Sequence, residues 1–275
     1  MVVQHNMTAM NSNRMLGVTT KNQAAQTEKL SSGYRINRAA DDAAGLSISE
    51  KMRRQIRGLD QASTNAQDAV SLVQTTEGAL NEVTDMLQRM NELSVKAANG
   101  TYTSTQKQYI ADEINQLVSE IDRVATTTKF NDQTVMKSET SFSFQIGNEA
   151  SETMTVKISS MKASQINSSL KSTLNWKATG NYSSIASFIN TVKSSLEKVA
   201  SQRSALGAIQ NRLEHTINNL DNIVENTTAA ESRVRDTDMA KSMVTYSNNQ
   251  ILAQAGQAML AQANQVNQGV LSLLQ

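Results

Sequence analysis

The chain has 275 residues, a formal net charge of +1, no cysteine and no proline. A charge this close to zero gives no electrostatic case for nucleic-acid binding, and the lack of cysteine excludes disulfides, thiolate metal sites and a cysteine nucleophile. Because proline costs about 3 kcal/mol in a helix interior, its absence permits long uninterrupted helices. Aromatic residues make up only 4% of the chain, so aliphatic side chains and methionine must supply the packing between helices.

The N-terminal segment, from about residue 6 to residue 30, is predicted to be a helix with few charges. Met7, Met10, Leu16 and Val18 lie near one face of it, and Gly33 marks its end because glycine commonly follows the last helical residue. The first 16 residues lack the apolar core of a Sec-type signal peptide, so we expect none.

A much longer helical pattern begins after residues 37–42. Its apolar and small residues alternate steps of three and four without a slip until Asn99-Gly100, which is typical of a helix with more than one neighbour. These positions are Ala66, Ala69, Val73, Thr76, Leu80, Val83, Leu87, Met90, Ser94 and Ala97. The same rhythm from Ile110 to Val124 predicts a second helix, joined to the first by a short loop and antiparallel to it.

The middle of the chain changes texture. Apolar residues alternate with polar ones on both sides of residues 147–151, which predicts a β-hairpin; they are Phe142, Phe144, Ile146, Met154, Val156 and Ile158. Serine, threonine, asparagine and lysine then dominate to about residue 184. We expect this stretch, which includes Trp176, to be exposed and without a helical stripe.

Helical rhythm returns from about residue 184 to residue 227, a length of roughly 65 Å at 1.5 Å per residue. The last 34 residues, 242–275, contain no charged side chain. They are too poor in charge for a solvated helix and too rich in Gln and Asn for a membrane span. Their heptad spacing calls for partner helices, so we predict polymer-core contacts at Leu252, Met259, Val266, Val270 and Leu273.

The predicted fold class is therefore all-α: an elongated helical bundle or coiled coil with a small β-hairpin insert and with its termini paired in a coiled coil. We expect residues 1–40 and 230–275 to form terminal helices in the inner core of a polymer. Residues 41–229 form a rod of long helices that carries the insert at about 138–184.

Other residue constellations argue against catalysis. Helix capping explains Asp41 and Asp42 better than a catalytic pair does. His5 and His215 are the only histidines, and no phosphate-binding glycine loop is present. We expect no enzyme activity, no cofactor, no metal, no nucleic-acid partner and no membrane insertion.

Five strings closely resemble bacterial flagellin. They are LSSGYRINRAADDAAGLSIS at 30–49, LQRMNELSVKAANGT at 87–101, IADEINQLVSEIDRVATTTKFN at 110–131, the hairpin string FQIGNEASETMTVKI, and AQAGQAMLAQANQVNQGVLSLL at 253–274. The resemblance covers about residues 1–160 and 180–275. Because the middle is short, the chain resembles a near-minimal form that lacks the large outer domains.

The resemblance implies a structural subunit that polymerises into the flagellar filament for swimming motility. It implies export by the flagellar type III apparatus without a cleaved signal peptide, and an extracellular location. The implied partners are further copies of the chain, the flagellar cap, the hook–filament junction and an export chaperone. Several flagellins are also ligands of an innate immune Toll-like receptor, and the matching residues here are Gln88, Arg89, Leu93 and Glu113.

Three alternatives remain open from the sequence. A hook–filament junction protein would resemble flagellin at both ends, although the match at LQRMNEL argues against it. A secreted effector or adhesin would have to bind through the Ser/Thr-rich middle and Trp176. An enzyme has no chemical constellation in its favour.

Overall fold

The computed structural model describes residues 5–172 and 182–273, and the side chains up to residue 266 in the last helix. The chain divides into two compact units, residues 1–56 with 225–275, and residues 57–224. Helices α2 (Ala43–Ala98) and α7 (Tyr182–Arg235) contribute to both units. The predicted boundaries at residues 40 and 230 separate the inner core of a polymer from its outer rod. They describe layers of the polymer rather than units of one chain, so they stay a prediction.

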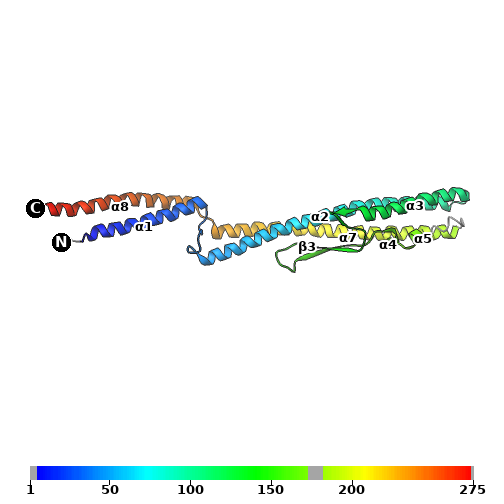
Figure 1. Cartoon of the computed structure of the whole chain (residues 1–275), viewed down its shortest axis with the longest axis horizontal. Coiled ribbons are helices and arrows are strands. Elements are labelled where there is room, and N and C mark those ends of the chain that lie inside the picture. Colours follow the sequence, from blue (N-terminus) through cyan, green and yellow to red (C-terminus); the bar gives the residue numbers. More distant parts are fainter. Residues whose placement is uncertain (1–4, 173–181, 274–275) are drawn as a thin grey trace. The chain divides into compact units, whose positions relative to one another are not determined.

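In the first unit, α1 (Met7–Ser32) pairs with α8 (Met239–Leu273), and Figure 1 shows the two side by side. Asn6 begins α1, because its side-chain oxygen accepts the N–H of Ala9 at 3.0 Å. Gly33 ends it at φ 76°, a left-handed conformation that glycine adopts without steric cost. The predicted helix stop and the predicted pairing of the terminal helices are both confirmed.

Two connectors, residues 33–42 and 236–238, lie against each other in the same unit. The N–H of Arg35 donates to the carbonyl of Arg235 at 2.7 Å, and the N–H of Thr237 donates to the carbonyl of Gly33 at 3.0 Å. These bonds form a single antiparallel bridge between Tyr34 and Asp236. The bridge fixes the point at which the chain leaves α1 and enters α8.

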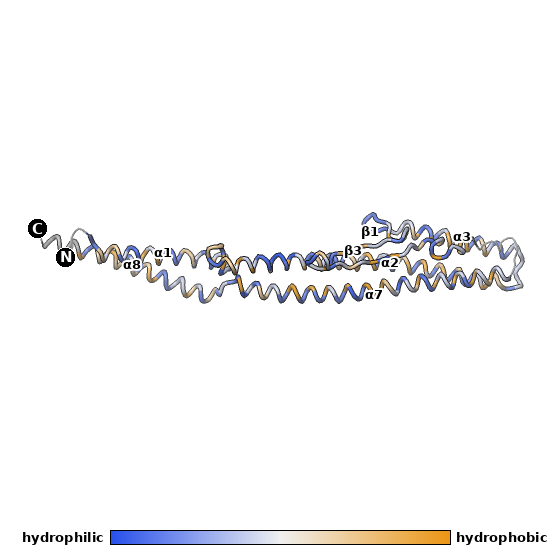
Figure 2. The backbone as a smooth tube through the Cα atoms, turned by 90° about the horizontal axis from the view of Figure 1, so that it is seen from below, coloured by the Kyte–Doolittle hydropathy of each residue, from blue (hydrophilic) through white to orange (hydrophobic). Residues whose placement is uncertain are grey.

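The core of the second unit is built from α2, α3 (Ser104–Thr127) and α7. All ten positions of the predicted α2 stripe are buried, so the alternation of three and four identified the buried face. Figure 2 shows the recurring hydrophobic positions along both long helices. Ile114 and Ile121 of α3 and Leu206 of α7 complete the same cluster.

Helix α7 ends eight residues later than the sequence predicts, at Arg235 rather than Thr227. The added turns lie in the first unit, where Glu231 accepts a hydrogen bond from the Ser49 hydroxyl at 3.1 Å and pairs with Arg235. The hydrogen bond between Ser49 and Glu231 is a tertiary contact that stabilises the added turns, which include residues of modest helix propensity such as Thr228 and Ser232.

Four short strands follow α3. The strands β1 (Lys129–Phe130) and β2 (Gln133–Thr134) flank Asn131 and Asp132, both at positive φ, as a two-residue type I′ hairpin turn requires. The strands β3 (Thr140–Gln145) and β4 (Thr153–Ile158) pair antiparallel with Phe142 opposite Val156. The predicted hairpin is confirmed.

The expectation that this stretch is exposed is wrong for part of residues 159–170. Two short helices, α4 (Ala163–Ile166) and α5 (Ser169–Ser172), lie there, and Met161, Ile166 and Leu170 are buried. Long-range contacts anchor the stretch, because the Asp122 carboxylate of α3 accepts the N–H of Ala163 at 2.9 Å. Trp176 lies outside the described residues.

Candidate assembly surface

The α1–α8 seam consists of small, amide and leucine side chains. Leu16 faces Gly256, where an added Cβ would lie 3.4 Å from the Leu16 Cδ1 atom, and the Asn6 amide donates to the carbonyl of Ala263 at 3.0 Å. The less exposed positions follow coiled-coil spacing in both helices. They are Ala9, Ser12, Leu16, Thr19, Gln23, Gln26 and Leu30 in α1, and Asn249, Ala253, Gly256, Leu260 and Ala263 in α8.

The predicted polymer-core row lies outside this seam. Leu252, Met259 and Val266, which we call the exposed row, are 56%, 62% and 57% exposed. Gly256 and Ala263 follow Leu252 and Met259 by four residues, so heptad spacing alone would group them with this row. The structure instead places the two small residues in the seam, because they permit the close approach of α1. The side chains of Val270 and Leu273 lie outside the described ones.

Exposed apolar side chains extend beyond this row. Met7, Met10, Met15 and Val18 of α1 are each more than half exposed, as is Ile251 of α8, and no residue of α1 is buried. Many exposed apolar side chains on two paired helices indicate an interaction site. Since α8 carries no charge beyond Lys241, its exposed sides lack the ions that normally solvate a helix face.

The candidate receptor residues lie in the second unit. Arg89 donates to the Glu113 carboxylate at 2.9 Å and to the Glu92 carboxylate at 3.3 Å. The hydrogen bond that Arg89 donates to Glu113, followed by the one that it donates to Glu92, raises the pKa of Arg89. Gln88 is exposed beside this pair, whereas Leu93 is 2% exposed and belongs to the core. Of the four predicted receptor residues, Gln88, Arg89 and Glu113 are therefore exposed, whereas Leu93 is buried.

Sequence reasoning missed an ionic cluster at the connectors. The Arg235 side chain, only 14% exposed, donates to the Glu50 carboxylate at 3.1 Å, lies 3.9 Å from Glu231, and sits under the Tyr34 ring at 4.6 Å from its centroid. The spacing of Glu231 and Arg235, four residues apart in a helix, was the available signal.

The acidic pair at the start of α2 is structural. The Asp42 carboxylate accepts the N–H of Gly45 at 2.9 Å, the geometry of a helix N-cap. The Asp41 carboxylate accepts the N–H groups of Arg38 at 3.0 Å and Asn37 at 3.1 Å, and these two bonds lower its pKa. The expectation of capping at Asp42 is confirmed, and Asp41 holds the connector.

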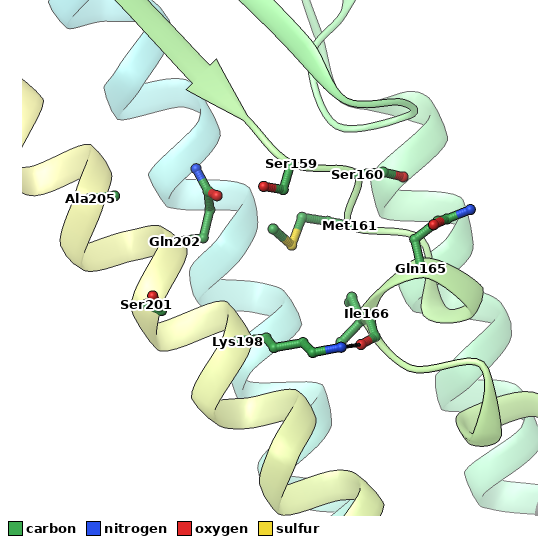
Figure 3. A pocket seen from close by; sticks show the side chains of 9 residues that line it. All are labelled: Ser159, Ser160, Met161, Gln165, Ile166, Lys198, Ser201, Gln202 and Ala205. Carbon is green, nitrogen blue, oxygen red and sulfur yellow. Dashed lines mark hydrogen bonds between the residues drawn. The ribbon is translucent and has the colours of Figure 1, made fainter.

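A pocket of about 280 Å³ lies between α7 and residues 159–166 (Figure 3). Lys198 reaches across it, and its amine donates to the Ile166 carbonyl at 2.6 Å. The lining contains no carboxylate and no imidazole, so it offers no acid–base pair of the usual kind. The hydrogen bond between Lys198 and Ile166 attaches α4 to α7 beside this pocket.

Within residues 5–172 and 182–273, no group of three or more His, Cys, Asp or Glu side chains could hold a metal ion. Across the same ranges, no helix has the length and hydrophobicity that a membrane crossing needs.

Long coiled-coil helices with unpartnered apolar faces define a class of structural proteins that associate through helix packing. Comparison with known proteins gives the family. Residues 3–140 match the bacterial flagellin N-terminal helical region, and residues 189–274 match the bacterial flagellin C-terminal helical region.

Relatives that match over the full length of the chain are also flagellar filament proteins. The chain is 49% identical to a flagellin of Halalkalibacterium halodurans and 46% identical to a flagellar filament 31.3 kDa core protein of Treponema maltophilum, each over 100% of both chains. A putative flagellar hook-associated protein from Vibrio parahaemolyticus shares the fold at 10% identity, with a TM-score of 0.63, over 71% of this chain and 100% of that one.

The chain belongs to the bacterial flagellin family, and its 275 residues fit a minimal form. Family membership makes it a structural subunit of flagellar filaments.

Proposed function

We propose that copies of this chain polymerise through the exposed apolar sides of α1 and α8, whose partners are the same helices of neighbouring copies. The observation that carries the proposal is the exposed row. Leu252, Met259 and Val266 are each more than half exposed on a helix that has no charge beyond Lys241 to solvate it.

The free energy that assembly gains from the exposed row follows from the exposed fraction of its three side chains. Fully burying a leucine, methionine or valine side chain contributes about 1.5–3 kcal/mol. Since somewhat more than half of each side chain in the row is still exposed, burying all three contributes about 2.5–5 kcal/mol per subunit. A heterologous contact of this kind that does not close into a ring generates a helix of subunits.

Folding of the terminal helices is coupled to assembly in this proposal. Most of the stability of a helix in a protein comes from tertiary packing, and α1 has no buried residue even when paired with α8. We infer that in the free chain these helices open readily, and that neighbouring copies supply the surface that holds them closed.

The test uses the full-length chain. Leu252→Gln with Met259→Gln should leave the melting temperature of the second unit unchanged and abolish filaments in electron micrographs, even with preformed filament fragments as seeds. Removal of residues 252–275 should do the same. The control is Tyr182→Gln, which also removes an exposed large apolar side chain. Normal filaments from the double variant would overturn the proposal.

Further partners follow from family membership. We propose export through the flagellar type III apparatus with the N-terminal segment retained, aided by an export chaperone, and assembly between the hook–filament junction and the cap. The mass of the chain recovered from filaments tests whether the segment is retained.

We also propose that a Toll-like receptor binds the second unit through Gln88, Arg89 and Glu113, with Leu93 supporting them from the core. The exposed Arg89–Glu113 pair supports this proposal. Arg89→Ala should weaken binding of the monomer to the receptor ectodomain at least tenfold. Arg123→Ala is the control, since Arg123 is an exposed arginine that is also paired with a glutamate. Equal binding by both variants would contradict the assignment.

A further inference from the structure

Helix α2 carries exposed charges of both signs along its length. Lys51 and Arg54, three residues apart and therefore on one face, are both exposed. Among the described residues neither forms an ion pair, whereas Arg53 between them pairs with Glu50. We call Lys51 and Arg54 the basic face.

Negative charge gathers farther along α2. Asp68, Glu82 and Asp85 are exposed, and they belong to one row in which steps of three and four pass through Ser71, Thr75 and Gly78. The three carboxylates form no ion pair with any described residue. Elsewhere α2 does form ion pairs, as between its Arg89 and Glu113 of α3 at 2.9 Å. We call this row the acidic row.

A glycine lies in the middle of the acidic row, at a position where packing inside the subunit does not require one. Gly78 is exposed in the middle of α2, and an added Cβ would meet nothing within 4 Å. A glycine here disfavours the helix relative to alanine, so internal packing does not explain it. A shallow hollow surrounds it, lined by Gln74, Glu77, Gly78, Asn81, Glu82 and Arg203.

We propose that the acidic row around Gly78 of one copy receives the basic face, Lys51 and Arg54, of a second copy. The opposite signs supply the complementarity. The missing side chain at Gly78 lets the backbone of a partner approach closely. Each copy carries both surfaces at different points of one helix, so the contact repeats head to tail from copy to copy. The inference rests on the proposed polymerisation and names a second contact within it.

Charge exchange tests the pairing. Lys51→Glu with Arg54→Glu should raise the critical concentration for assembly at least tenfold at low salt, and Glu82→Lys with Asp85→Lys should do the same. All four substitutions together should restore it to within about threefold of the unmodified chain, because the opposite signs then face each other again. The control, Lys129→Glu with Lys193→Glu, makes the same change in net charge as the first pair, at two exposed lysines elsewhere, and should leave assembly unchanged.

Gly78→Leu tests the close approach separately. It should leave the melting temperature of the free chain unchanged or higher and should reduce assembly at all salt concentrations. The inference is overturned if either pair of reversals assembles normally, or if the four substitutions together assemble no better than one pair alone. The proposed function fails in a different way, when the unmodified folded chain forms no filaments with seeds.

Discussion

Substitution of Gly256 tests the α1–α8 seam directly. An alanine there gains about 0.8–1.0 kcal/mol of helix propensity. Its methyl group would lie 3.4 Å from the Leu16 Cδ1 atom, an ordinary van der Waals contact, and partial burial of one carbon adds up to about 0.5 kcal/mol. The sum, about 1–1.5 kcal/mol, should shift the equilibrium between paired and open terminal helices five- to tenfold toward pairing.

A leucine at the same position should act in the opposite direction. Its atoms beyond Cβ would extend into the space that Leu16 occupies, and overpacking typically costs about 1–3 kcal/mol. Gly17 provides the matched control, since an added Cβ there meets nothing within 4 Å. At Gly17, alanine should give the propensity gain alone.

Hydrogen exchange of α8 peptides in the free chain measures both effects. Exchange should slow about five- to tenfold in Gly256→Ala and accelerate in Gly256→Leu. Equal slowing by alanine and leucine would refute the reasoning, because it would mean that α1 does not lie over Gly256.

Three other predictions concern the connectors and turns. Asp132→Gly should raise the free energy of unfolding by about 0.5–1 kcal/mol, because Asp132 holds φ 61° in the β1–β2 turn. A higher melting temperature would show this gain. Arg235→Ala should accelerate hydrogen exchange of the connector amides, whereas Arg233→Ala, at an exposed site, should not. The pKa of Asp41 is lowered in the folded state, so its contribution is present above about pH 4 and is lost as the pH falls through the folded-state pKa. Asp41→Asn should therefore reduce the acid-induced increase in connector exchange.

The buried face of α2 could be predicted because one strict rhythm runs across ten positions, from Ala66 to Ala97, and only one helix face satisfies it. The β3–β4 hairpin was predictable for the same reason, because its apolar residues recur at every second position. Residues 159–172 were not, since helices of four residues show no period. Their burial depends on Asp122 and Lys198, which lie far away in the sequence.

The assembly surface was predictable only in part. Heptad spacing identified α8 as a helix that needs partners, but a row of apolar residues does not say which partner it faces. In the structure α1 takes the side with Gly256 and Ala263, where its backbone fits, and leaves Leu252 and Met259 exposed. The choice depends on the size of the side chains, which periodicity ignores.

The two proposed contacts between copies differ in physical origin, and salt separates them. The exposed row of α8 associates by burying apolar surface, which excluded salts such as sulfate strengthen. The basic face and the acidic row of α2 attract through charges at the surface, which salt screens over about 10 Å at 0.1 M. Filaments of Leu252→Gln with Met259→Gln should stay absent at every salt concentration. The defect of Lys51→Glu with Arg54→Glu should shrink as sulfate is added, because screening removes the new repulsion while apolar burial is retained. A defect of equal size at low and high salt would show that Lys51 and Arg54 act through packing rather than charge.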